Sequence, residues 1–234
     1  MVVADPTLRV ERAMLREGAA LVIGCDEVGR GAIAGPVAVG LSVFGGRPGG
    51  APKGLRDSKM LSEAKREELF PLVGAWSLHS AVGLASNEEV ERIGIVAALG
   101  LSAARALAQL HDDGVEMAGA VVLLDGSHDW LTPAIGRGGA IPDGAPRPTV
   151  TTRAKADRDC AVVAAASVLA KVHRDRLMIE ADAVHPGYHW SGNKGYASAE
   201  HYAAIDELGP SPLHRWSWLR QPALLDAEGT EAVA

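Results

Sequence analysis

The chain has 234 residues, of which 47% are hydrophobic and only 4% aromatic, and its formal net charge is −6 at pH 7. This length and apolar content predict one large domain, or one domain with a helical extension, around a hydrophobic core. The acidic balance argues against a strongly basic protein that coats nucleic acid regardless of sequence, but it allows a nuclease, because a metal site contributes acidic residues and a basic groove can coexist with an acidic remainder.

The N-terminal segment, residues 8–18, mixes Arg and Glu with apolar residues. This pattern predicts a short amphipathic helix that ends at Gly18, and it differs from the apolar region of a signal peptide. No stretch approaches the roughly 20 apolar residues of a membrane span. The two cysteines, Cys25 and Cys160, do not make a disulfide framework, so we expect a reducing, cytoplasmic setting.

After this helix the pattern predicts alternating strands and helices. In chain order these are strands at residues 22–26 and 36–44, a helix at 62–73, a strand at 76–86, a helix at 87–110 that Gly94 and Gly100 weaken, strands at 120–125 and 149–154, and an Ala-rich helix at 156–183. Glycine and proline predict a surface loop or hairpin at 130–148, and a shorter helix is expected at 198–208 before a disordered tail after Pro222. An early antiparallel meander followed by crossovers favours an α/β fold with a mixed sheet flanked by helices.

Two of the apolar runs end in carboxylates, and they carry the main functional signal. Residues 21–25 lead into Asp26 and Glu27, and residues 121–124 lead into Asp125. Such runs predict buried strands that deliver the charges to one edge of a sheet, which is where open α/β sheets bind ligands. Carboxylates gathered at such an edge repel one another unless a hard cation neutralises them.

The first acidic pair continues into a turn that suits a phosphate. Asp26 and Glu27 would face opposite sides of a regular strand, so both reach one metal ion only where the strand ends and the backbone turns. Gly29 and Gly31 allow close approach of a ligand to backbone N–H groups, and Arg30 can bind a phosphate with two donors. A tight turn with solvated acids is the simpler interpretation, but the whole six-residue string favours a functional one.

Other candidates each have two interpretations. Asp125 is either an ordinary aspartate at a strand end or a metal ligand, and Asp157 either caps the Ala-rich helix or completes the metal site. Ser58 and Lys59 fit either a helix start or a phosphate contact. Three or four carboxylates without His or Cys favour Mg²⁺ or Mn²⁺. Sites with two such ions about 3.5–4 Å apart perform phosphoryl transfer, and Asp26 is the candidate bridge.

Together these motifs resemble those of one family. They occur in the order seen in the prokaryotic type 2 ribonucleases H, at residues 26–31, 57–59, 124–126, 155–157, 165–175, 193–196 and 214–215. The match runs from about residue 21 to residue 218, and the ordered set is far more specific than any single motif. The chain therefore resembles a bacterial ribonuclease HII.

The resemblance implies a ribonuclease H-like fold and an endonuclease. The expected parts are an N-terminal helical extension at residues 1–20, a catalytic core at 21–184, a substrate-contacting helical region at 185–220 and a disordered tail at 221–234. The implied activity is hydrolysis of the RNA strand of RNA–DNA hybrids and cutting 5′ of single ribonucleotides embedded in duplex DNA. Such cuts serve ribonucleotide and primer removal, and they leave a 5′-phosphate and a 3′-hydroxyl.

The resemblance also implies roles for individual residues. The catalytic, metal-binding carboxylates would be Asp26, Glu27, Asp125 and Asp157. Contacts to the ribose 2′-hydroxyl, largely through backbone groups, would come from Gly29, Arg30 and Gly31. Tyr196 would stack on the sugar after the ribonucleotide and help to sense the junction. This division suits the chemistry, since the 2′-hydroxyl is what distinguishes RNA from DNA.

The chain departs from the family pattern in several places. Met60 stands where a second lysine is common, and Gly94 stands where an asparagine is common. The insert at 130–148 lengthens the gap between Asp125 and Asp157; we expect an inert loop, with a lid or a partner site as alternatives. The tail lacks the glutamine-and-aromatic motif by which some relatives bind a sliding clamp, so clamp binding is not implied. We expect a monomer that binds nucleic acid and no membrane.

Two other functions compete with this hypothesis. A DNA-directed or integrase-like nuclease of the same fold is one, and the Gly-Arg-Gly turn together with Tyr196 argues against it. A catalytically silent protein that binds hybrids is the other, and the presence of all four carboxylates argues against that.

Overall fold

A five-stranded mixed sheet forms the middle layer of the protein. The computed structural model describes residues 5–45, 49–136 and 146–219. The order of the strands is β3-β2-β1-β4-β5, and their bounds are β1 Val22–Val28, β2 Val37–Phe44, β3 Ser80–Ala85, β4 Val121–Asp125 and β5 Thr149–Arg153. Strands β1, β2 and β3 form an antiparallel meander, whereas β4 pairs parallel with both β1 and β5. The predicted mixed sheet is confirmed.

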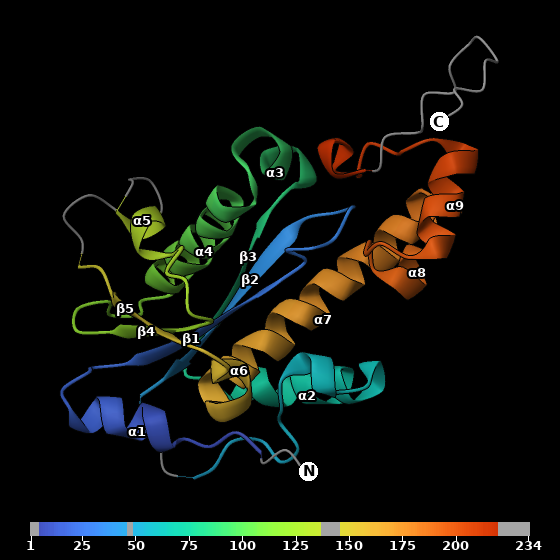
Figure 1. The fold of residues 1–234 in the computed structure, drawn as a ribbon. Helices are drawn as coiled ribbons and strands as arrows, with labels where there is room; N and C mark the ends of the chain where they lie inside the picture. The colour runs from blue at the N-terminus through green and yellow to red at the C-terminus, as the bar shows by residue number, and fades with distance from the viewer. Residues whose placement is uncertain (1–4, 46–48, 137–145, 220–234) are drawn as a thin grey trace, which may run out of the picture.

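Helices cover both faces of this sheet (Figure 1). Helix α4 (Ile95–Asp112) packs on β2 and β3, while α7 (Ala161–Val184) crosses β1 and β2 on the other face, with α2 (Glu63–Trp76) against it. The shorter helices are α1 Arg9–Arg16, α3 Asn87–Ile93, α5 Thr132–Ile135, α6 Ala156–Asp159, α8 Trp190–Asn193 and α9 Ala199–Leu208. In the described part of the chain, none of the helices combines the length and the apolar character needed to cross a membrane.

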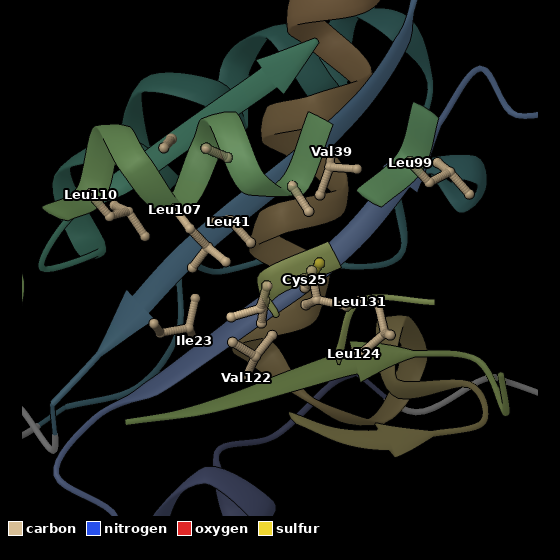
Figure 2. Close-up of a cluster of buried hydrophobic side chains, with 14 of the residues drawn as sticks. Ile23, Cys25, Val39, Leu41, Leu99, Leu107, Leu110, Val122, Leu124 and Leu131 are labelled. Atoms are coloured by element: carbon tan, nitrogen blue, oxygen red, sulfur yellow. The ribbon is translucent and has the colours of Figure 1, made fainter. Parts of the chain in front are cut away.

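The largest hydrophobic cluster lies between α4 and the sheet. Alternate residues of the central strands point toward α4, as the two-residue period of a strand requires. Figure 2 shows how strand and helix side chains meet there, with labels on Ile23, Cys25, Val39, Leu41, Leu99, Leu107, Leu110, Val122, Leu124 and Leu131. The opposite faces of the same strands pack on α7 and α1. The strands β1 and β2 are therefore buried on both sides, which holds the end of β1 in a fixed position.

Glycines in the strands let helix backbones lie directly on the sheet. A Cβ atom on Gly24 of β1 would lie 2.3 Å from the carbonyl oxygen of Val162 in α7. On the other face, a Cβ atom on Gly83 of β3 would lie 1.9 Å from the carbonyl oxygen of Ser102 in α4. Both obstructing atoms are backbone atoms, which cannot move aside as a side chain can.

We expect Gly83→Ala to lower the free energy of unfolding by at least about 1–3 kcal/mol, because an overpacked core must shift its backbone. The matched control is Gly74→Ala, since an added Cβ at this exposed position of α2 meets no atom within 4 Å. Alanine there should leave the protein as stable or slightly more stable. Urea unfolding of the two variants checks this, and a Gly83→Ala protein as stable as the wild type would contradict the close approach of α4.

The predicted Ala-rich helix is interrupted at its start. Cys160 is extended, with φ −115° and ψ 121°, and it separates α6 from α7. The cause lies in the N-terminal segment, because Thr7 pairs with this position: its N–H donates to Asp159 O at 3.0 Å, and its carbonyl oxygen accepts from Ala161 N at 3.1 Å. Glu11 of α1 then accepts from Val162 N at 2.9 Å and caps the start of α7.

Other boundaries also differ from the sequence prediction. The helix predicted at 87–110 is two helices that meet at Gly94, whose φ of +78° suits glycine. Strand β1 continues through Val28, two residues beyond its predicted end, because β2 pairs with it as far as Ala38. The region 130–148 contains α5, and residues 137–145, like the tail after Pro222, lie outside the described residues.

Candidate active site

The four predicted carboxylates come to the same edge of the sheet. Asp26 and Glu27 lie near the end of β1, and Asp125 is the last residue of β4. The parallel register pairs Cys25 with Leu124, so both strands bring their acids to the same level. Asp157 lies in α6, directly after β5, and its N–H donates to Asp125 Oδ1 at 3.3 Å.

Asp26 is the most deeply buried of the four. Its relative exposure is 2%, and its Oδ1 accepts from Glu27 N at 2.9 Å. Its Oδ2 is buried and has no hydrogen-bond partner among the described residues. Burial raises the pKa of Asp26 to about 8, and the charges of Glu27 and Asp125 add to the rise. A buried carboxylate oxygen without a donor is costly unless a cation balances it.

The pKa values of the neighbouring carboxyls are also raised. Burial raises the pKa of Glu27, although Arg30, whose Nη1 lies 3.4 Å from Glu27 Oε1, acts in the opposite direction. Burial also raises the pKa of Asp157 to about 6, and the charges of Asp125 and Asp57 contribute. The negative charges are therefore close enough to disfavour each other's ionisation.

The chemistry of these residues fits a hard divalent cation. All four side chains offer carboxylate oxygens, the ligands that Mg²⁺ and Mn²⁺ prefer, and the unpartnered Oδ2 of Asp26 lies among them. No group of three or more His, Cys, Asp or Glu side chains is already close enough to hold an ion, as far as the described ranges extend. Strand β1 continues through Val28, and the glycine-rich turn follows it at residues 29–31, so Asp26 and Glu27 lie within the strand and alternate across it.

A cavity of about 230 Å³ opens beside this edge. Its lining comprises Glu27, Val28, Gly29, Arg30, Gly31, Ser58, Lys59, Lys171 and Tyr196. All six residues that the sequence predicted as substrate contacts are among them. Glu27 belongs both to the cavity and to the acidic edge, so a ligand in the cavity lies next to the carboxylates.

The two walls of the cavity are joined by a hydrogen bond. Gly29 has φ +86°, a conformation that suits glycine, and its N–H donates to the hydroxyl oxygen of Tyr196 at 3.1 Å. On the other side, His201 accepts from Trp190 through Nε2 at 2.9 Å, so its proton is on Nδ1 and is donated to the carbonyl oxygen of Tyr196 at 2.9 Å. Tyr196 is thus held through both its hydroxyl and its backbone.

Lys59 lies between the cavity and the acids. Burial lowers its pKa, but the charges of Asp26, Asp57 and Asp157 outweigh burial, so the pKa of Lys59 is raised overall. The lysine remains cationic and can balance part of the negative charge. The hydroxyl of Ser58 accepts from Ser167 at 2.8 Å, which fixes this turn against α7.

Two further residues, for which no role was predicted, also lie at this site. Asp57 is 2% exposed, its Oδ1 accepts from Lys59 N at 3.0 Å, and its charge acts on Asp157. Lys171 lines the cavity, with its Nζ 5.8 Å from the centre of the Tyr196 ring. Both residues lie inside motifs noted in the sequence, at residues 57–59 and 165–175, and this position was the signal that could have identified them. One turn further along α7, Asp175 pairs with Lys171 at 2.5 Å.

Solved structures define the class of the fold. The PCNA:RNase HII complex from Archaeoglobus fulgidus matches with a TM-score of 0.62 at 22% identity, covering 87% of this chain and 98% of that chain. Bst-RNase HIII in complex with Mn²⁺ matches with a TM-score of 0.64 at 23% identity, covering 84% and 65%. The protein therefore has the α/β fold of the ribonucleases H.

Sequence comparison identifies the family within that class. The family model for ribonuclease HII matches residues 23–221. Ribonuclease HII of Streptomyces griseus is 44% identical, covering 95% of this chain and 86% of the relative, and that of Thermus thermophilus is 42% identical, covering 83% and 84%. The chain belongs to the ribonuclease HII family. It is thus a type 2 ribonuclease H, and membership implies divalent-metal-dependent ribonuclease H activity on RNA–DNA hybrids.

Proposed function

We propose that the protein is an endonuclease that cuts 5′ of single ribonucleotides in duplex DNA as well as within the RNA of hybrids, leaving a 5′-phosphate and a 3′-hydroxyl. The observation that carries this proposal is the shared wall of the site. Glu27 belongs to the acidic edge, and the cavity that it lines also contains the Gly-Arg-Gly turn and Tyr196. A ribose in the cavity would thus place its phosphate beside the carboxylates.

Asp26, Glu27, Asp125 and Asp157 would hold two Mg²⁺ or Mn²⁺ ions. Such ions supply an activated water and stabilise the leaving oxygen. The protein's own contribution is to orient the phosphate. Arg30, Lys59 and Lys171 line the cavity, where their cationic side chains can donate to the oxygens of the phosphate. The 2′-hydroxyl would meet the backbone of residues 29–31, and Tyr196 would pack on the following sugar.

The proposed organisation has three described parts. Residues 21–184 would form the catalytic core, and residues 185–220 would contact substrate through Tyr196. Ile33 N donates to Gly195 O at 2.9 Å, which supports this role by docking the second part on the first. The extension at 1–20 would hold the start of α7 near Asp157 through Thr7 and Glu11. One solved neighbour is a PCNA complex, but we do not propose clamp binding for this protein. We propose that it acts as a monomer in the cytoplasm.

A labelled DNA duplex carrying one ribonucleotide tests the proposal, with Mg²⁺, with Mn²⁺ and with a chelator. We expect a cut immediately 5′ of the ribonucleotide in both metals and none with the chelator. Cleavage of a long hybrid without cleavage at the single ribonucleotide would refute the junction role of the cavity. Cleavage of neither substrate would favour a silent hybrid-binding protein, and cleavage of an all-DNA duplex would favour a DNA-directed nuclease.

A further inference from the structure

Two arginines next to the cavity-lining residues are fully buried, and backbone carbonyls accept their hydrogen bonds. Arg174 on α7 donates through Nε to Pro36 O at 2.8 Å, through Nη1 to Lys194 O at 2.8 Å and through Nη2 to Ala34 O at 3.0 Å. Arg215 donates to Gly35 O at 3.0 Å. Buried charges are expensive, so fold stability alone gives little reason for two of them here.

Arg174 contacts both walls of the cavity. Its guanidinium carbon lies 5.3 Å from the centre of the Tyr196 ring. On the other wall, a Cβ atom added to Gly29 would lie 2.2 Å from Arg174 Nε, so the guanidinium fills the space behind the glycine. Its acceptor Lys194 directly precedes Gly195 and Tyr196 and has a left-handed φ of +51°. One planar group thus fixes both sides of the Gly29–Tyr196 hydrogen bond.

Arg215 acts on the turn itself. Its Nη1 donates to the carbonyl oxygen of Arg30 at 3.3 Å. The peptide that joins Arg30 to Gly31 is trans, so its C=O and N–H point in opposite directions. With the carbonyl directed at Arg215, the N–H of Gly31 is directed away from the buried guanidinium, and Gly31 lines the cavity. Burial lowers the pKa of Arg215 to about 10, so it stays cationic at neutral pH.

We propose that Arg174 and Arg215 are positioning residues that set selectivity for a single ribonucleotide, by holding the peptides of residues 29–31 and Tyr196 in the geometry that recognises one 2′-hydroxyl. This inference rests on the proposed function of the cavity. The planar guanidinium of arginine holds several carbonyl oxygens at once through N–H donors in fixed directions. Lysine, a point charge on a flexible stem, cannot reproduce this arrangement. A long hybrid offers many riboses and registers, so it depends less on this geometry.

The test compares Arg174→Lys and Arg215→Lys with the wild type. The control is Arg176→Lys, an exposed arginine on α7 that pairs with Glu67. The readout is the ratio of kcat/KM on a duplex with one ribonucleotide to kcat/KM on a long hybrid, with Mn²⁺ binding followed by calorimetry. Small misplacements of a reacting group cost up to on the order of 10²-fold, so we expect the ratio to fall by about tenfold or more in the first two variants. The control should keep it, and Mn²⁺ affinity should not change.

A merely structural role predicts a different result. Loss of stability would lower activity on both substrates equally and leave the ratio unchanged, which would overturn the proposal. Because Arg174 acts partly through Tyr196, Arg174→Lys should lower the ratio less in a Tyr196→Ala background than in the wild type, whereas a fully additive loss would contradict the inference. A wild type that fails to cut at a single ribonucleotide would instead refute the proposed function.

A second measurement uses only the wild-type protein, so it tests the proposal even if the arginine variants do not fold. The Nε–H signals of Arg174 and Arg215 can be followed by NMR in the wild-type protein. A chelator removes the metal, so a nucleic-acid duplex can bind without being cleaved. We expect a duplex with one ribonucleotide to shift them more than an all-DNA duplex does. Equal shifts with both duplexes would overturn the proposal.

Discussion

Replacing Asp26 with asparagine is expected to reduce cleavage of every substrate by at least about 10³-fold, since bound ions contribute several kcal/mol of transition-state stabilisation. Within the described ranges, the buried Oδ2 of Asp26 accepts no hydrogen bond. An amide is neutral and offers one oxygen where a carboxylate offers two, so it is a much poorer ligand for a hard cation. The measurement is the single-turnover cleavage rate with saturating Mg²⁺ or Mn²⁺, and Asp125→Asn should behave in the same way.

The fold should survive this change. The asparagine side chain has almost the same shape and removes a charge that burial disfavours, so the metal-free variant should unfold at a temperature no lower than the wild type. Asp113→Asn, at an exposed position after α4, serves as the control and should keep the wild-type rate. Substantial activity of Asp26→Asn with metal present would refute the assignment of the site.

Tyr196→Ala should lower kcat/KM on a single-ribonucleotide duplex by about 10–10²-fold, because aromatic contacts to nucleic acid are worth about 1–3 kcal/mol each. The loss on a long hybrid should be clearly smaller. The ring lines the cavity, and the cationic groups of Lys171 and Arg174 lie 5.8 Å and 5.3 Å from its centre. Parallel steady-state kinetics on the two substrates measures the difference.

Tyr196→Phe separates the ring from its hydroxyl. Phenylalanine keeps the packing surface but leaves the N–H of Gly29 without the acceptor that it has at 3.1 Å. We therefore expect a loss intermediate between wild type and Tyr196→Ala on the single-ribonucleotide duplex. Equal losses on both substrates in the alanine variant would remove the proposed junction role of Tyr196.

The sequence predicted the central architecture because its signals there are local. The apolar runs before Asp26 and Asp125 are buried strands, as their composition indicates, and the mixed sheet follows from the order of the elements. The break at Cys160 has no local signal, since it depends on pairing with Thr7, more than 150 residues away. The end of β1 was missed for a similar reason: β2 continues to pair where the glycine-rich turn predicts an earlier end.

The residue types of the candidate site, at strand ends and turns, could be predicted from the sequence. The contacts that helix α7 makes with the cavity could not. Arg174 and Lys171 belong to a helix whose sequence reads as a buried Ala-rich segment followed by charged residues. Their contacts with the cavity exist only because α7 lies across β1 and β2 and carries its second half toward Tyr196. Asp57 likewise gains its place beside Asp157 from tertiary packing, which no local pattern records.

The hydrogen bonds that close the cavity have a consequence for biosynthesis. Gly29 and Tyr196 are separated by 167 positions, and Arg30 and Arg215 by 185. Contacts of such long range carry a large loop-closure entropy and form late in folding. As the ribosome releases the chain from its N-terminus, the sheet and its acidic edge can assemble well before Arg215 emerges. A nascent chain can therefore hold all four carboxylates before the hydrogen bonds of Tyr196 and Arg215 close the cavity beside them.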